Sequence, residues 1–294
     1  MTAVQSAANP ETPPLPDAAP DTSAADVPIQ HPCPPSDSCA YCQGAVPEGQ
    51  ALDWSFLDAV YCISLKSRND RAERVAEEFH RTGLCRKVVF YRPVKHPVKG
   101  TIGSWESHRA VAGLALEQGA GTTLVFEDDV QFVRNLRPRR VRAIAQAIRD
   151  LPPDWNLFYL GHWPLWCYFV RPNVLRTASA CAHAYVASPR LMAWLWDHPH
   201  SSRDGLPMMT VAGHQLDAAF AALPGCYAVF PMIATQSISR SDNFATTTRP
   251  KKKFKHIISR SSNREWFLST FMRPAELIMA LLSPISWLIQ RFKR

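Results

Sequence analysis

From about residue 56 onward, short apolar runs alternate with amphipathic segments along the chain. Residues 59–65 (AVYCISL) form an apolar, β-branched run before a polar segment, which is typical of a buried parallel strand. A helix is predicted to begin at Asn69 or Asp70 and to end before Gly83. The same reasoning predicts further strands at 88–91, 122–126, 156–160, 183–187 and 227–230, and further helices at 104–118, 138–150, 188–196 and 213–222. This alternation predicts an α/β fold with a mostly parallel central sheet covered by helices on both faces.

Residues 1–50 differ sharply in composition from this region. They contain ten of the 25 prolines, six acidic residues and neither Lys nor Arg. Such a segment has too little apolar surface to offset its ordering entropy, so we expect a disordered, acidic tether. It lacks the basic start and apolar stretch of a signal peptide, which predicts a cytoplasmic protein.

The cysteines allow two interpretations. Eight cysteines in 294 residues are too few for a disulfide scaffold. Five lie in apolar or strand-like stretches and are expected to be buried thiols in a reducing compartment: Cys62, Cys85, Cys167, Cys181 and Cys226. Within the tether, His31, Cys33, Cys39 and Cys42 can supply four zinc ligands, and Cys39 and Cys42 have the spacing of a ligand pair. Loose cysteines in a linker are the alternative.

The net charge of +8 is distributed unevenly. Residues 1–50 carry −6, residues 51–248 carry +5 and residues 249–294 carry +9. We therefore expect three parts: a tether at 1–50, a catalytic domain at 51–248 and a basic tail at 249–294. The basic excess lies in the tail and no nucleic-acid-binding motif accompanies it, so no nucleic-acid partner is expected.

The basic tail continues into an amphipathic segment. On a helical wheel one face is apolar, formed by Phe267, Phe271, Ile278, Leu282, Ile285 and Ile289. Residues 275–289 are too short and too interrupted to span a bilayer. An apolar face flanked by Lys and Arg predicts helices that lie on an anionic membrane surface, which would make the protein peripheral on the inner face of the cytoplasmic membrane. A helix packed on the domain or at a dimer interface is the alternative.

Three carboxylates, Glu127, Asp128 and Asp129, directly follow the predicted strand at 122–126. Ligands of open α/β sheets bind beyond the carboxyl ends of strands. Adjacent carboxylates repel one another, and a hard divalent cation with oxygen ligands relieves that repulsion. An acidic loop that caps the following helix is the alternative.

Four blocks in this order resemble glycosyltransferase family 25, which includes bacterial lipopolysaccharide galactosyltransferases and the domains that galactosylate collagen. The blocks are VYCISLKSRNDRAERV, then KGTIGSWESHRAV, then LVFEDDV, and finally the dispersed ACAHAYVASPR, QLDAAF and FPMIATQSISRSDN. The second block matches the family at Gly100, Gly103, Ser107 and His108. Two positions depart from the family pattern, since Ser64 replaces an Asn and Ser104 replaces a Cys.

The resemblance implies a GT-A-like nucleotide-sugar-binding domain that transfers a hexose with inversion. The implied donor is a UDP-sugar, with UDP-galactose expected, and the implied acceptor is a lipopolysaccharide or related glycan or glycolipid. Glu127 and Asp129 would hold Mn²⁺ or Mg²⁺, and Asp217 would be the catalytic base. Further donor-binding residues implied by the matched blocks and their basic turn are Arg68, Arg71, Gly103, His108, Asp128, His183, Gln236 and Asp242.

Several alternatives stay open at this point. Glu106, Asp204 and Asp242 are rival bases, and each carboxylate can instead be a surface group. Histidines in such blocks are also common as core hydrogen-bonding residues. The aromatic segment GHWPLWCYF can stack on an acceptor sugar or belong to the core. A catalytically silent glycosyltransferase-like protein that binds a glycan or partner, or a metal-dependent phosphate-ester hydrolase, would use the same site.

Overall fold

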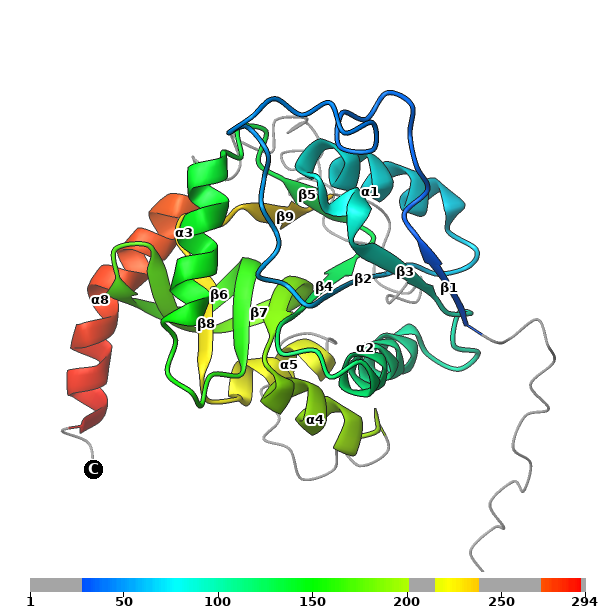
Figure 1. The fold of residues 1–294 in the computed structure, drawn as a ribbon. Helices are drawn as coiled ribbons and strands as arrows, with labels where there is room; N and C mark the ends of the chain where they lie inside the picture. Colours follow the sequence, from blue (N-terminus) through cyan, green and yellow to red (C-terminus); the bar gives the residue numbers. More distant parts are fainter. Residues whose placement is uncertain (1–27, 201–214, 238–270, 292–294) are drawn as a thin grey trace, which may run out of the picture.

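The computed structural model describes residues 28–200, 215–237 and 271–291 (Figure 1). The strands are β1 (Ile29–Pro32), β2 (Ala59–Ile63), β3 (Val88–Arg92), β4 (Thr123–Glu127), β5 (Val130–Phe132), β6 (Leu157–Arg171), β7 (Val174–Ala187), β8 (Cys226–Val229) and β9 (Ala234–Gln236). The helices are α1 (Asn69–Thr82), the 3₁₀ turn η2 (Leu84–Arg86), α2 (Gly100–Glu117), α3 (Pro138–Arg149), α4 (Pro189–Asp197), α5 (Gln215–Ala222) and α8 (Arg273–Arg291).

Seven strands form the central sheet in the order β1-β3-β2-β4-β7-β6-β8. Strands β3, β2 and β4 run parallel, as do β6 and β8, whereas β1 and β7 are antiparallel to their neighbours. Strands β5 and β9 form a separate two-stranded sheet. The predicted α/β class is confirmed, and the arrangement is consistent with a GT-A-like fold.

Helices cover both faces of the sheet, as the near-continuous apolar strands predict (Figure 1). Helices α1 and α3 lie on one face, where Phe79 of α1 packs against Phe90 and Phe126. Helices α2, α4 and α5 lie on the other, where Tyr185 and Phe220 meet edge to face at 5.2 Å between ring centroids. The carboxyl end of β4, which carries the acidic cluster, therefore emerges from a fully packed core.

The N-terminal segment corrects one prediction. Residues 28–50 belong to the fold, because β1 pairs with β3 and the Cys33 amide donates to the Val88 carbonyl at 3.1 Å. Cys33 and Cys39 are buried in the core. The expectation of a disordered tether up to residue 50 is therefore wrong for this part. A proline at the end of an edge strand is compatible with sheet pairing, so a Pro-rich composition did not exclude it.

The hairpin of β6 and β7 is longer than the sequence predicts. The predicted strand at 156–160 continues through the aromatic segment GHWPLWCYF to Arg171, and the chain returns from Val174. Its pairing includes several register shifts, and Cys181 in β7 adopts a positive φ of 80°. These irregularities hid the strands, because they break the strict period of two that sequence patterns reveal.

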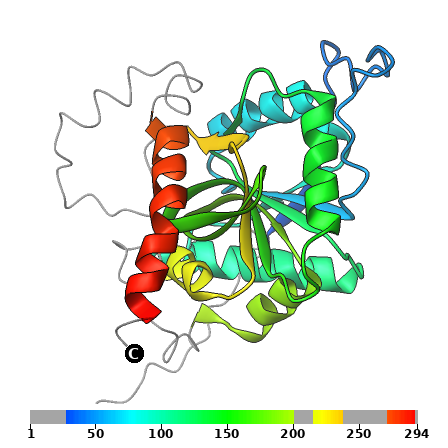
Figure 2. The same ribbon diagram turned by 90° about the vertical axis from the view of Figure 1, so that its left-hand side faces the viewer.

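The C-terminal helix corrects the predicted domain boundary. The described part of the tail packs on the domain, with α8 against β6 and with Met272, Glu276 and Ala280 buried (Figure 2). The polar residue Glu276 thus faces inward, while Ile278 and Leu282 from the predicted apolar face are exposed. In the described part of the chain, no helix has the length and apolarity needed to cross a membrane. The basic segment before residue 271 lies outside the described residues.

Candidate active site

A cavity of about 570 Å³ lies at the carboxyl end of β4. Its walls come from α2, the β6–β7 hairpin, α5 and the loop before α2. Eight of the predicted site residues line it: Arg71, Gly103, His108, Glu127, Asp128, Asp129, Asp217 and Gln236 of β9. The structure therefore brings together residues from four of the matched sequence blocks.

Asp128 is buried, Glu127 and Asp129 are half-buried, and the cluster is only partly neutralised. Arg71 of α1 donates to the Asp128 carboxylate at 2.9 Å, and both side chains are about nine-tenths buried. Burial, reinforced by the charge of Asp128, raises the pKa of Glu127 to about 7. Burial and the two neighbouring carboxylates also raise the pKa of Asp129 well above its usual value. Three carboxylates facing one guanidinium therefore leave unbalanced negative charge when all are ionised.

These residues fit a divalent cation. Within the described residues, the buried Oδ1 of Asp129 has no hydrogen-bond partner. The Glu127 carboxylate lies 3.6 Å from Nε2 of His108, which is longer than an ordinary hydrogen bond. Carboxylate oxygens without strong protein partners are the ligands that Mg²⁺ and Mn²⁺ prefer. The donor set therefore agrees with the predicted metal ligands Glu127 and Asp129.

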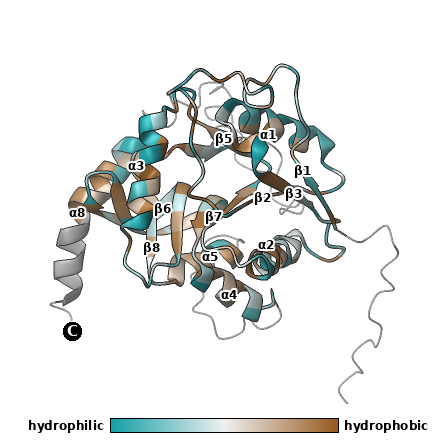
Figure 3. Ribbon diagram, viewed as in Figure 1, coloured by the Kyte–Doolittle hydropathy of each residue, from teal (hydrophilic) through white to brown (hydrophobic). Residues whose placement is uncertain are grey.

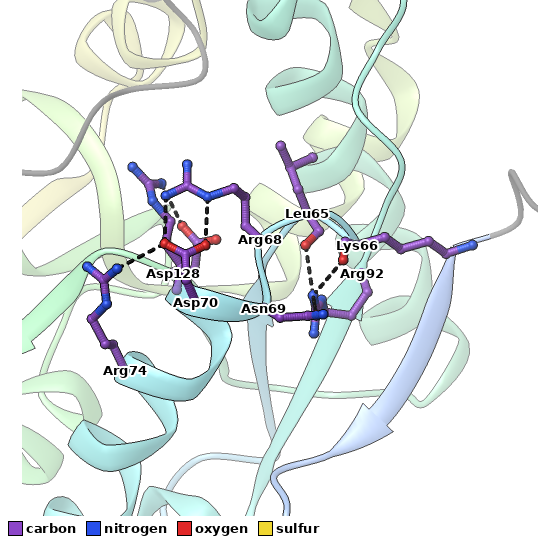
Figure 4. A network of polar contacts seen from close by, with 9 residues as sticks. Leu65, Lys66, Arg68, Asn69, Asp70, Arg74, Arg92 and Asp128 are labelled. Atoms are coloured by element: carbon purple, nitrogen blue, oxygen red, sulfur yellow. Dashed lines mark hydrogen bonds and ion pairs between the residues drawn. The ribbon is translucent and has the colours of Figure 1, made fainter.

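The turn between β2 and α1 is held by a residue that sequence reasoning missed. The Arg92 guanidinium donates to the carbonyls of Ser64, Leu65 and Lys66 and to Oδ1 of Asn69 (Figure 4). This fixes the first turn of α1 and with it the position of Arg71. The signal available in the sequence was an arginine at the end of a buried strand, a place where a charge needs several acceptors.

Arg68 differs from its neighbour Arg71. It forms a bidentate ion pair with Asp70, which also binds Arg74 (Figure 4). The described lining of the cavity does not include Arg68. The matched basic turn thus contributes one arginine, Arg71, to the cavity wall, and that arginine is engaged by Asp128.

His108 is held as a neutral, oriented side chain. Its Nδ1 lies 2.8 Å from the Tyr185 hydroxyl, and the two rings stack. Burial lowers the pKa of His108 to about 4, against an opposing effect of the Asp217 charge. Tyr185, from the predicted His-Ala-Tyr strand, is therefore a positioning residue for a histidine that faces Glu127.

Gly103 has a packing role that the sequence did not reveal. It lies within α2, which begins at Gly100, and not in a loop before the helix. A Cβ at Gly103 would lie 2.9 Å from the Cβ of His96. The glycine therefore lets the loop before α2 approach the helix, and this loop supplies Lys95 and His96 to the cavity.

Four further predicted residues are not placed at the cavity. The described lining excludes His183, which is buried against Gly161 and the Ala234 backbone, and burial lowers its pKa to about 3. Glu106, a rival base, is also absent from the described lining and instead accepts the His200 amide at 2.6 Å. Asp242, predicted to bind the donor, and Asp204, a rival base, lie outside the described residues.

The fold and the site together define a class of protein. It is an α/β domain in which a carboxylate cluster at a strand end lies beside a cavity that suits a metal-bound anionic ligand. Comparison with known proteins is more specific. The chain is 25% identical over 130 residues to procollagen galactosyltransferase 1 of Danio rerio, covering 36% of this chain and 21% of that protein. It is 28% identical over 130 residues to the inactive glycosyltransferase 25 family member 3 of Homo sapiens, covering 36% and 22%.

The matched segment thus spans about a fifth of the length of these curated relatives. They are members of glycosyltransferase family 25, so the resemblance indicated by the four sequence blocks is confirmed. No family model matches the chain. A solved glycosyltransferase involved in glycosylation of the major capsid of PBCV-1 aligns with a TM-score of 0.35 at 12% identity, over 69% of this chain and 99% of that one.

Proposed function

We propose that this protein is a metal-dependent, inverting glycosyltransferase that moves a hexose from a nucleotide sugar, with UDP-galactose as the donor, onto a lipopolysaccharide or related surface glycan. The observation that carries the proposal is the Glu127-Asp128-Asp129 cluster, which lines a cavity that Asp217 lines as well. The similarity to galactosyltransferases supports the reaction class.

The carboxylates of the cavity and the basic loop before α2 would both bind the nucleotide-sugar donor. Glu127 and Asp129 would hold Mn²⁺ or Mg²⁺, which when bound stabilises charge on the departing UDP. Arg71 holds Asp128 in place through its 2.9 Å contact, and its charge opposes the rise in the Asp128 pKa that burial causes. Lys95 and His96 add basic side chains to the wall, where they can pair with diphosphate oxygens.

Asp217 is the proposed base. A single displacement with inversion needs a group that accepts the proton of the acceptor hydroxyl as it attacks the anomeric carbon. Asp217 lines the cavity, and its charge acts on His108 and Tyr185, which places it near the carboxylate cluster. It is the carboxylate of this lining outside that cluster, so it can take the proton while the other three engage the donor.

An aromatic surface beside the cavity suits a glycan acceptor. Trp163 and Leu165 of β6 line the cavity and are partly exposed. Further along the strand, Trp166 and Tyr168 stack at 6.0 Å with an interplanar angle of 11° and are also exposed. Flat aromatic faces bury the apolar faces of sugar rings, so the acceptor would lie along this strand.

We also propose that α8 binds an anionic membrane surface, which would bring the enzyme to a lipid-linked acceptor on the cytoplasmic face. The described part of α8 is largely apolar (Figure 3). It exposes Leu277, Ile278, Leu281 and Leu282, and Phe271 just before the helix is exposed as well. An apolar face that is exposed among the described residues and belongs to the +9 segment 249–294 matches the composition of helices that lie in a membrane interface.

The reaction is tested by measuring UDP release from a panel of UDP-sugars with Mn²⁺, with and without acceptor glycan. We expect release that EDTA abolishes and that Glu127→Gln and Asp129→Asn reduce at least about 100-fold, as expected when metal ligands are lost. Glu117→Gln, an exposed acid at the end of α2, is the matched control and should retain full activity.

A second candidate function is favoured by the comparisons, because several relatives are named as inactive or probable inactive family members. A catalytically silent domain would bind a glycan or partner without releasing UDP from any donor. That outcome in the UDP-sugar panel would overturn the transferase proposal. Release of phosphate from simple esters without any sugar acceptor would instead favour a hydrolase.

Membrane binding is tested by sedimentation with vesicles containing anionic phospholipid. Leu281→Glu replaces a side chain that is 72% exposed, so it should weaken binding without disturbing the packed face of α8. Val98→Glu is the control, since Val98 is 82% exposed on a different surface. Equal vesicle binding by all three proteins would refute the membrane proposal.

A further inference from the structure

Four metal-type side chains converge on the side of the molecule where the N-terminal segment meets α1. Cys39 and Cys42 come from the N-terminal segment, His80 from the last turn of α1 and Cys85 from η2. Their ligand-type atoms all lie within 4.8 Å of one another, and none of the three cysteines is in a disulfide. Nothing in the proposed transferase reaction uses them.

The distances match a tetrahedron around one ion. Zinc binds sulfur at about 2.3 Å and nitrogen at about 2.05 Å, so tetrahedral ligands are separated by about 3.8 Å for S···S and about 3.5 Å for S···N. The sulfur of Cys85 lies 3.8 Å from that of Cys39 and 3.7 Å from that of Cys42. The Cys42 sulfur lies 3.5 Å from Nδ1 of His80. Disulfide sulfurs would be about 2.05 Å apart, so these contacts are not bonded pairs.

The surrounding backbone supports ligand geometry. The Cys42 amide lies 3.4 Å from the Cys39 sulfur, within reach to donate to a thiolate. Gly44, two residues after Cys42, has a φ of +68° and allows the chain to turn sharply after the Cys-x-x-Cys pair. The Nε2 of His80 faces the Cys33 sulfur at 4.0 Å, which leaves Nδ1 for a metal.

We propose that Cys39, Cys42, His80 and Cys85 bind one Zn²⁺ as a closed structural site. Three thiolates and one imidazole are a donor set typical of structural zinc, and four protein ligands leave no position for substrate. Spacing in the sequence suggested His31 and Cys33 as the partners of Cys39 and Cys42. In the structure His31 instead stacks on Phe90, and His80 and Cys85 take the two remaining positions.

The ion would join two parts of the chain that are far apart in sequence. It would bind residues 39–42 to α1 and η2, where Tyr41 already packs closely against Gly83. Because an unfolded chain lacks this preformed site, zinc binding would add directly to folding free energy. The N-terminal segment would then be held in the fold by a metal and by the short β1–β3 pairing.

Metal content of the full-length protein tests the proposal. Purified without chelator and dialysed, it should contain about one zinc per chain, as expected for a four-ligand site. Cys42→Ser and Cys85→Ser should lower the content to below about one tenth of an equivalent, because a missing thiolate removes most of the affinity. Cys181→Ser, a half-buried cysteine outside the cluster, is the matched control and should keep its zinc.

Two further measurements separate ligand loss from misfolding. His80→Cys should retain zinc with four thiolates, whereas His80→Ala should lose it. Co²⁺ substituted into the wild type should give a thiolate charge-transfer band that Cys42→Ser reduces by about one third, since one of three thiolates is removed. Folded wild-type protein without zinc, zinc retained by folded Cys42→Ser and Cys85→Ser, or a mass showing a disulfide among these cysteines would overturn the proposal.

Discussion

Replacement of Glu276 tests whether α8 is a structural part of the domain. Its carboxylate lies 2.8 Å from Nε2 of His162 on β6, and both side chains are fully buried although they are 114 residues apart. The opposite nitrogen of His162 lies 2.7 Å from the Ser179 hydroxyl, which in turn contacts Thr177 at 2.6 Å. A buried polar chain therefore joins α8 to both strands of the hairpin.

The size of the effect follows from this burial. Glu276→Ala leaves His162 without its acceptor and opens a cavity at the helix interface, and loss of one partner from a buried pair costs about 3–5 kcal/mol. Glu276→Gln keeps an oxygen that can accept from Nε2, so we expect a loss of about 1–2 kcal/mol. The free energy of unfolding, measured with urea, should fall by these amounts in the two variants.

A double-mutant cycle with His162→Ala identifies the contact itself. Because the two side chains are in contact, the sum of the stability losses in the two single variants should exceed the loss in the double variant by about 1–3 kcal/mol. Glu117→Gln serves again as the exposed acidic control and should change stability by less than about 0.5 kcal/mol. Additive losses, or a Glu276→Ala loss below about 1 kcal/mol, would refute the packing of α8 on β6.

Three shorter predictions concern the core around the site. Burial lowers the pKa of His183 to about 3 in the folded state, below its unfolded value, so the stability that the neutral ring allows is complete above about pH 6.5 and is lost as the pH falls. At pH 5 the free energy of unfolding should be lower by about 2 kcal/mol. His183→Gln should flatten that part of the pH profile of stability measured with urea. Gly161→Ala should cost about 1–3 kcal/mol in the same assay, because its Cβ would lie 2.5 Å from Nε2 of His183 and closer still to the Ala234 carbonyl. Arg71→Met should cost about 3–5 kcal/mol in EDTA, because it leaves Asp128 uncompensated, and an equal urea midpoint in wild type and variant would contradict this account.

Much of the fold is visible in the sequence because the buried elements obey simple periods. The predicted strand at 59–65 corresponds to β2, and the predicted helix from Asn69 corresponds to α1. The strand β1 was missed because it lies in a proline-rich segment, and β5 and β9 were missed because three residues are too few to show a period. Their existence depends on partners elsewhere in the chain, such as β3 for β1.

The candidate site was predictable where chemistry follows directly on a strand end. Glu127 and Asp129 were found because the carboxyl end of a buried strand is a ligand position in α/β folds. The sequence did not distinguish His108 from His183, because both lie in matched blocks and only packing decides which one lines the cavity. For a similar reason the sequence predicted only two of the four clustered residues, Cys39 and Cys42, since His80 and Cys85 lie about 40 residues further along the chain.

The two candidate metal sites lie at opposite ends of helix α1, so the effect of EDTA on one site must be separated from its effect on the other. Arg71 lies in the first turn of α1 and His80 in the last, about 14 Å apart along the axis at 1.5 Å per residue. The N-terminal end is held independently by Arg92 and Asp128. EDTA that empties only the carboxylate cluster should therefore abolish turnover reversibly, and Mn²⁺ should restore it. If EDTA also removes zinc, Mn²⁺ alone should not restore stability, because a site with three thiolates selects Zn²⁺ over a hard cation. Comparing rescue by each ion thus separates loss of catalysis from loss of the fold.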